Sequence, residues 1–143
     1  MIIESVTLEN FRQFKDKHQI TFSTDDVVNV TVVMGENGAG KTTLEQSFTW
    51  CLYGENTFQD KELVNREIRN AMSIGDSVKV EVELIVQSQM RRYRIRRRQI
   101  VTKKNTNKCR PSGEDFKVML QNENGDWEEV PKSVQARATV EEM

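Results

Sequence analysis

The stretch Gly35-Glu-Asn-Gly-Ala-Gly-Lys-Thr-Thr43 matches the Walker A pattern G-x-x-x-x-G-K-[ST] at every fixed position. Just before it, Asn29–Met34 is rich in β-branched residues and predicts a buried strand. Just after it, Leu44–Tyr53 carries apolar side chains at helical spacing. Strand, glycine-rich loop and helix in this order are the setting in which the motif binds phosphate. The fold is therefore expected to form around this loop.

The chemistry of the loop follows from its residue types. Glycines let the backbone turn its N–H groups inward at a helix N-terminus, which makes a nest for an anion. The Lys41 ammonium would reach the β- and γ-phosphates, and the Thr42 hydroxyl would bind Mg²⁺. The alternative is a glycine-rich turn with a chance lysine, which a complete match in this context disfavours. The predicted nucleotide site comprises Glu36, Asn37, Gly38, Ala39, Gly40, Lys41, Thr42 and Thr43, with Lys41 as its catalytic residue and Thr42 as its metal ligand.

Composition limits the remaining possibilities. A chain of 143 residues suits one domain, and its 36% hydrophobic and 30% charged residues predict much surface for the mass. Residues 1–76 carry a net charge of −5 and residues 77–143 one of +4, within a total of −1. The two cysteines lack metal-ligand spacing, and there is neither a signal peptide nor a membrane-length apolar run. These features predict a cytoplasmic protein with reduced thiols and no membrane partner.

Strands are expected at Ile2–Glu9 and His18–Ser23 before the one at Asn29–Met34. The loop thus follows the third strand, which is the order of ABC-type and SMC-type ATPase heads. Several segments resemble the N-terminal lobe of SMC-like ATPases, a group that includes RecF, RecN, the double-strand-break-repair ATPases and DndD, the ATPase of DNA phosphorothioation systems. Those segments are Leu8–Arg12, Val33–Thr43, Phe48–Gly54, Glu62–Asn65, Tyr93–Arg97 and Asp126–Glu129. Phe48–Gly54, followed by Glu62–Asn65, resembles DndD most closely.

The resemblance implies ATP and Mg²⁺ as cofactors. It implies that the first strand borders the third and brings Arg12 to the nucleotide phosphates, a side chain then without a role in folding. The alternative for Arg12 is a surface ion pair. Val64 lies in a segment that borders the adenine in this family. The implied partners are a C-terminal lobe, a second head in a homodimer, double-stranded DNA and partner DNA-processing proteins.

The second half of the chain predicts an antiparallel meander. One register places apolar and charged pairs on opposite faces at once, whereas a slip of one residue would break both sets. Its pairs are Val86 with Tyr93, Leu84 with Ile95, Glu83 with Arg96 and Glu81 with Arg98. A second hairpin is expected between 116–121 and 127–130, and a helix begins at 131–133.

The resulting fold class is α/β, leaning to α+β, with a mixed sheet around the phosphate-loop helix plus the meander. Residues 1–143 are interpreted as a single N-terminal lobe, with a nucleotide-binding part at 1–76, hairpins at 77–130 and the start of a truncated helix at 131–143. The sequence contains no Walker B strand, no Ser-Gly-Gly signature loop and no long heptad segment. The chain is therefore expected to bind ATP and to hydrolyse it negligibly.

Met90–Arg110 contains ten Lys or Arg residues and no acid. One interpretation is a sequence-independent contact with DNA phosphates; the other is a solvated strand face partly neutralised by Glu81 and Glu83. The candidate DNA contacts are Arg94, Arg96, Arg98, Lys103, Lys104 and Lys108. Two functions remain open: an ATPase head that couples ATP-driven dimerisation to DNA modification, defence or repair, and a nucleotide-dependent protein-interaction switch whose partner handles the DNA.

Overall fold

The structure, a computed structural model, describes residues 1–131 and 133–143, with the backbone alone over 133–136. Its strands are β1 (Ile2–Phe11), β2 (Phe14–Thr21), β3 (Ser77–Ser88), β4 (Arg91–Asn105), β5 (Lys108–Gln121) and β6 (Trp127–Glu129). Its helices are α1 (Lys41–Tyr53), α2 (Arg66–Ala71) and α3 (Ser133–Glu141).

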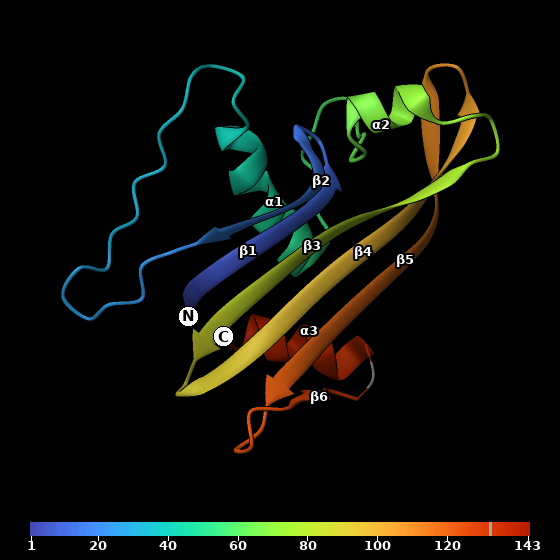
Figure 1. Cartoon of the computed structure of the whole chain (residues 1–143). Helices are drawn as coiled ribbons and strands as arrows, with labels where there is room; N and C mark the ends of the chain where they lie inside the picture. Colours follow the sequence, from blue (N-terminus) through green and yellow to red (C-terminus); the bar gives the residue numbers. More distant parts are fainter. Residues whose placement is uncertain (132) are drawn as a thin grey trace.

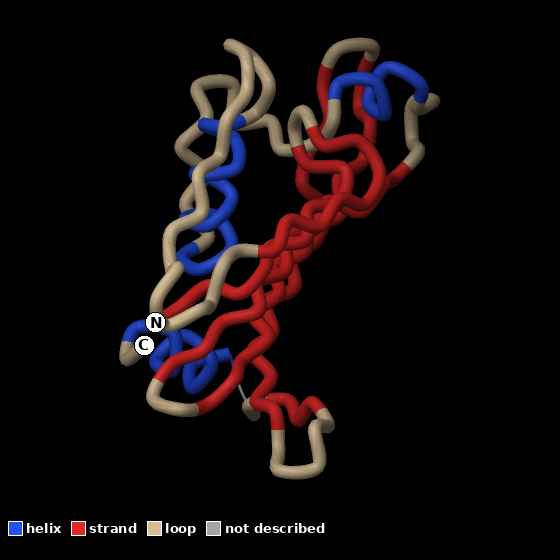
Figure 2. Tube along the Cα trace, turned by 60° about the vertical axis from the view of Figure 1, so that its left-hand side comes forward, coloured by secondary structure: helices blue, strands red, loops and turns tan. Residues whose placement is uncertain are grey.

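All the strands named above form one antiparallel sheet in the order β2-β1-β3-β4-β5-β6. Helices α1 and α3 lie on the same face of this sheet, and α2 lies beside the far end of the β4–β5 hairpin (Figures 1 and 2). The core fills the space between α1 and the sheet, where alternate residues of β3 meet the inner side of α1. Its fully buried members include Val6, Leu8, Phe11, Trp50, Cys51, Val80, Val82, Leu84, Val86, Ile95 and Val118.

The predicted register of the meander is confirmed. β3 and β4 pair Val86 with Tyr93, Leu84 with Ile95, Glu83 with Arg96 and Glu81 with Arg98. The hairpin from β5 to β6 also forms, with Gly125 in the left-handed region at φ 88°. The helix predicted after residues 131–133 is α3, and the helix predicted after the phosphate loop is α1.

The predicted strand at Asn29–Met34 is wrong for this structure. Residues 29–34 run as an irregular, exposed segment on the outside of the molecule, visible at the left of Figure 1. The sheet is consequently antiparallel rather than mixed, and β1 borders β2 and β3 instead of this segment. A strand needs a partner for its backbone groups, and residues 29–34 pair with none of the described strands.

Most of the basic stretch lies in two long strands. Residues 103–105 continue β4 and residues 108–110 begin β5, with a tight turn at 106–107. Long twisted ladders let these strands run past the body of the sheet to α2 (Figure 1). The two early strands and the later meander thus belong to one sheet rather than to separate layers.

Candidate nucleotide site

The phosphate loop ends in a helix start that is open to an anion. Gly38 and Gly40 hold φ values of 85° and 99°, a region that side chains other than glycine rarely adopt. Gly40 is the N-cap of α1 and supplies no side-chain cap, so the first N–H groups of the helix have no side-chain acceptor. A cavity of about 210 Å³ lies here, lined by Gln13, Asn37, Gly38, Gly40, Lys41, Thr42 and Thr43.

Of the predicted loop residues, all but Glu36 and Ala39 line this cavity. Glu36, Asn37, Gly38 and Ala39 are exposed, and Thr42 lines the cavity. The Lys41 ammonium folds back on its own loop and donates to the carbonyl oxygens of Gly35 and Glu36, the latter at 2.9 Å. A phosphate would replace these two neutral acceptors with a charged one.

Arg12 lies in the turn between β1 and β2, at φ 52°. Its Nη1 donates to both carboxylate oxygens of Asp60, at 2.8 and 2.9 Å, and to the carbonyl oxygen of Glu62 at 2.7 Å. The guanidinium also lies 4.4 Å from the centre of the Phe58 ring. In this structure Arg12 thus forms the ion pair that was its alternative interpretation, and its contacts tie the β1–β2 turn to the loop that follows α1.

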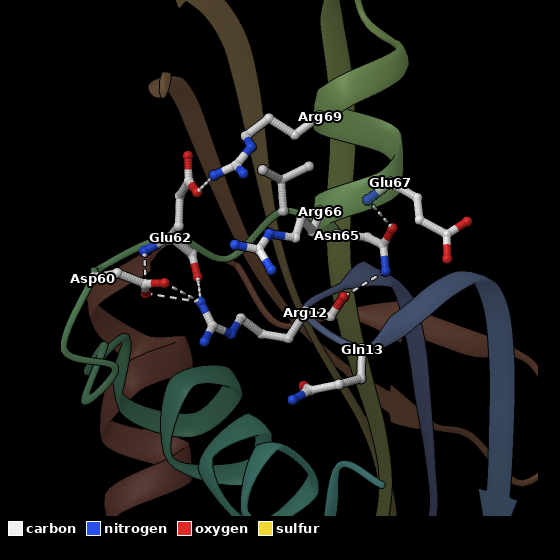
Figure 3. A pocket seen from close by; sticks show the side chains of 9 residues that line it. Arg12, Gln13, Asp60, Glu62, Asn65, Arg66, Glu67 and Arg69 are labelled. Carbon is white, nitrogen blue, oxygen red and sulfur yellow. Dashed lines mark hydrogen bonds and ion pairs between the residues drawn. The ribbon is translucent and has the colours of Figure 1, made fainter. Parts of the chain in front are cut away.

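Asp60 responds to this contact. Burial raises the pKa of the Asp60 carboxyl. Hydrogen bonds from Arg12 and from the Glu62 backbone N–H outweigh this effect, so the pKa lies below its ordinary value. The carboxylate is consequently charged at neutral pH and holds Arg12. Figure 3 shows Arg12 directed toward Asp60 and the Glu62 carbonyl oxygen.

A second cavity of about 550 Å³ adjoins this turn, lined by Arg12, Gln13, Asp60, Glu62, Val64, Asn65, Arg66, Glu67 and Arg69 (Figure 3). Val64, predicted to border the base, lines this cavity although it is largely buried. Asn65 caps α2 with its side-chain oxygen and donates from Nδ2 to the Arg12 carbonyl oxygen. Strand-like pairing also joins Phe11 to Val64, so the wall of the cavity is tied to the end of β1.

The β1–β2 turn packs on the phosphate loop through residues that the sequence did not single out. The Thr43 hydroxyl donates to Gln13 Oε1, and Gln13 lines both cavities. A Cβ on Gly40 would lie 3.4 Å from the Phe14 ring, which shows how closely the turn seats against the loop. Only the position of Gln13 next to Arg12 hinted at a role, whereas Asp60 carried no signal in the sequence.

The predicted DNA contacts divide into two sets. Arg94, Arg96 and Arg98 lie on the sheet face opposite α1, each within 4.0 Å of an acid. Those acids are Glu83, Glu81 and Asp115, and the last was absent from the expected charge balance. Lys103 is buried, and its Nζ donates to the carbonyl oxygens of Arg69 and Met72 at the end of α2.

Lys104 and Lys108 are exposed beside the turn of the β4–β5 hairpin, as is Arg110. Among the described residues, these three side chains form no ion pair. We call them the basic tip.

The part of the chain that the structure describes contains no helix long and apolar enough to cross a membrane.

Arg97, by contrast, points into the core. It is 2% exposed, and its Nε donates to the Cys51 carbonyl oxygen at 3.1 Å at the C-terminal end of α1. The guanidinium pairs with Glu114 and lies 4.3 Å from the centre of the Phe116 ring. Gly54 ends the helix where a Cβ would approach the guanidinium to 3.0 Å. The phosphate-loop helix is therefore fastened to β4 and β5 by a buried cation.

Comparison with known proteins identifies a family and several related sequences. The profile of a family described as "AAA domain" matches residues 5–138. A DNA double-strand break repair Rad50 ATPase of Thermoplasma volcanium is 34% identical over 97 residues, which is 68% of this chain and 9% of that protein. DNA replication and repair proteins RecF of Clostridium beijerinckii and Acetivibrio thermocellus are 33% and 37% identical over 47% and 46% of this chain.

The chain spans 17% of the length of each RecF protein and 9% of the Rad50 ATPase. The profile, in contrast, covers nearly all of the chain, including the phosphate loop and the sheet. The chain therefore belongs to the AAA domain family, among its SMC-like P-loop ATPases.

Proposed function

We propose that this chain is the ATP-binding N-terminal lobe of an SMC-like ATPase that acts on DNA. The observation that carries the proposal is the uncapped start of α1, with the Walker lysine and threonine beside a cavity of phosphate size. Such a helix start favours a bound anion through its free N–H groups and its dipole. The relatives named above are repair proteins, which supports repair before modification or defence as the setting.

In this proposal the backbone of Glu36 to Thr43 would surround the phosphates. Lys41 would leave its two carbonyl acceptors and bind the β- and γ-phosphates, and Thr42 would hold Mg²⁺, whose charge neutralises the phosphate oxygens. Asn37 would lie on the γ-phosphate side. Thr42 and Lys41 both line the cavity, so the residues present fit a magnesium nucleotide.

Arg12 would be the second cation of the site. The guanidinium lines the second cavity, which shares Gln13 with the cavity at the phosphate loop, and it is held by Asp60. A nucleotide phosphate would have to compete with this carboxylate. Binding at Arg12 would then release Asp60 and the loop around it, while Val64 would border the base.

The site needs further groups for hydrolysis. The sequence offers no Walker B glutamate, and residues 27–34 expose a line of apolar side chains beside the phosphate loop. We propose that a C-terminal lobe covers this segment and supplies the missing groups, and that a second head completes the site in a homodimer. This chain alone would bind ATP and turn it over negligibly, because water positioning and charge neutralisation are incomplete.

DNA binding is assigned to the basic tip rather than to the whole basic stretch. No described residue pairs with the ammonium groups of Lys104 and Lys108, and Arg110 adds a third exposed cation. Arg94, Arg96 and Arg98 would contribute only where DNA displaces their acids, and buried Lys103 would not reach DNA. Double-stranded DNA is the partner that a row of exposed cations without base-reading groups suits.

Calorimetric titration of the 143-residue chain with Mg-ATP and with Mg-ADP tests the proposal. We expect saturable binding by the wild type and none by Lys41→Ala, with unchanged melting temperature in the absence of nucleotide. Glu45→Ala, an exposed position on the same helix, is the matched control and should bind as the wild type does. Equal binding by the wild type and Lys41→Ala would contradict the proposal.

A further inference from the structure

The two cavities described above meet at one side chain. Gln13 lines the cavity at the phosphate loop and also the cavity formed by Arg12, Val64 and Asn65. A nucleotide with its phosphates in the first and its base toward the second must pass this side chain. Figure 3 shows Gln13 extending from the β1–β2 turn toward α1, below Arg12 in this view.

The hydrogen bonding of Gln13 leaves one half of its amide free. Oε1 accepts from the hydroxyl of Thr43, which is 4% exposed. No described residue accepts a hydrogen bond from Gln13 Nε2. An amide carries two N–H donors besides its oxygen, so this side chain can hold Thr43 and still donate to a ligand.

The backbone fixes the place of this amide. Gln13 follows Arg12, whose positive φ of 52° forms the β1–β2 turn, and precedes Phe14, whose ring lies against Gly40. Pairing of Phe11 with Phe14 closes the hairpin just behind it. The side chain is thus carried by a turn that is seated on the phosphate loop.

We propose that Gln13 is a nucleotide-binding residue that donates a hydrogen bond from Nε2 to the α-phosphate, between the Walker loop and the base. The proposal rests on the proposed function, since it requires a nucleotide on the loop. Lys41 and Thr42 would reach the outer phosphates, and a side-chain donor at this junction would add to the backbone N–H groups around the inner phosphate. A neutral amide supplies one without the carboxylate competition that restrains Arg12.

A double-mutant cycle separates direct contact from an effect through Thr43. Calorimetry with Mg-ATP compares Gln13→Met in the wild-type chain and in Thr43→Val, which removes the hydroxyl. We expect Gln13→Met to weaken binding about tenfold in both backgrounds, as for a lost hydrogen bond to a charged acceptor. A loss that vanishes in Thr43→Val would overturn the proposal, because Gln13 would then act only by positioning Thr43.

Further arms keep the outcome decisive. Gln13→Glu retains an acceptor for Thr43 but lacks the donor, and it should weaken Mg-ATP binding even if Thr43→Val binds too weakly to measure. Gln19→Met and Gln19→Glu, at an exposed position of β2, should bind as the wild type does. Inorganic tripolyphosphate should lose affinity for Gln13→Met as ATP does; a loss for ATP alone would contradict a phosphate contact. Wild type that fails to bind Mg-ATP would instead refute the proposed function.

Discussion

Strand β3 and the segment at residues 27–34 have similar sequences and opposite surroundings. In β3, Val80, Val82, Leu84 and Val86 are fully buried between α1 and the neighbouring strands. In residues 27–34 the valines stand 45–89% exposed. The backbone N–H groups of 29–34 donate no hydrogen bond to any described residue, whereas β3 is paired along both edges. Burial of apolar surface and completion of ladder hydrogen bonds depend on a neighbour, so the same residue types are ordered in one region and exposed in the other.

The largest expected effect lies on the buried side of this comparison. Arg97→Ala should lower the free energy of unfolding by about 3 kcal/mol, because it leaves buried carbonyl oxygens of α1 without a donor and empties space beside Phe116. Urea unfolding followed by circular dichroism measures this. Arg110→Ala, which removes an exposed arginine from β5, should change stability by less than about 0.5 kcal/mol. Equal losses for both variants would refute the role assigned to Arg97.

A matched pair of valines tests the comparison itself. Val82→Thr should cost about 1–3 kcal/mol, because the hydroxyl is desolvated inside the core. The same substitution at Val32, which is 74% exposed, should change the free energy of unfolding by less than about 0.5 kcal/mol. The urea midpoints of unfolding of the two variants, each compared with that of the wild type, measure these changes. A destabilisation at Val32 as large as that at Val82 would show that residues 27–34 are packed in solution.

Much of the ordered region could be predicted from sequence, for a physical reason. Alternation in β3 and β4 admits only one register that buries the valines and pairs the acids with arginines, and that register is found. The same reasoning failed at Asn29–Met34, because a strand-like pattern carries no information on whether a partner strand is at hand. Lys103 was likewise predicted to be exposed to DNA. Nothing in the neighbouring sequence indicates that its ammonium group binds the carbonyl oxygens at the end of α2.

In the nucleotide site, too, some residues could be predicted from the sequence and others could not. The Walker residues meet because they are contiguous in sequence, whereas Arg12, predicted through a family resemblance, lines the neighbouring cavity. Asp60 and Gln13 depend on contacts between segments far apart in the chain. Those contacts arise from the positive-φ turn at Arg12 and the pairing of Phe11 with Val64, which no local pattern announces.

The Arg12–Asp60 pair gives opposite effects for its two partners. Arg12→Ala should weaken Mg-ATP binding about tenfold and also lower stability modestly, because the guanidinium anchors the loop after α1. Asp60→Asn should raise the affinity several-fold, since Arg12 is then free to meet a phosphate. Calorimetry at pH 7, where the lowered pKa keeps Asp60 charged, resolves both. If Asp60→Asn bound Mg-ATP more weakly than the wild type does, Asp60 would support nucleotide binding rather than restrain Arg12.

The smallest expected effect concerns DNA. Replacing Lys104, Lys108 and Arg110 with serine should weaken duplex binding alike for different sequences. The slope of log affinity against log salt should fall by roughly one for each lost phosphate contact. Fluorescence anisotropy over a salt series measures the slope, and Lys103→Met serves as a buried contrast that affects stability instead. An unchanged slope in the triple variant would assign the basic tip to solubility alone.

Amide hydrogen exchange with and without Mg-ATP tests the central claim most directly, since it reads the sheet, residues 27–34 and the phosphate loop in one experiment. In the free chain, β3 and β4 should be strongly protected and residues 29–34 should exchange at nearly unprotected rates. Mg-ATP should slow exchange at residues 35–44 and at the Arg12–Gln13 turn while leaving 29–34 unprotected. Strong protection of 29–34 in the free chain, or no response of the loop to Mg-ATP, would contradict the account.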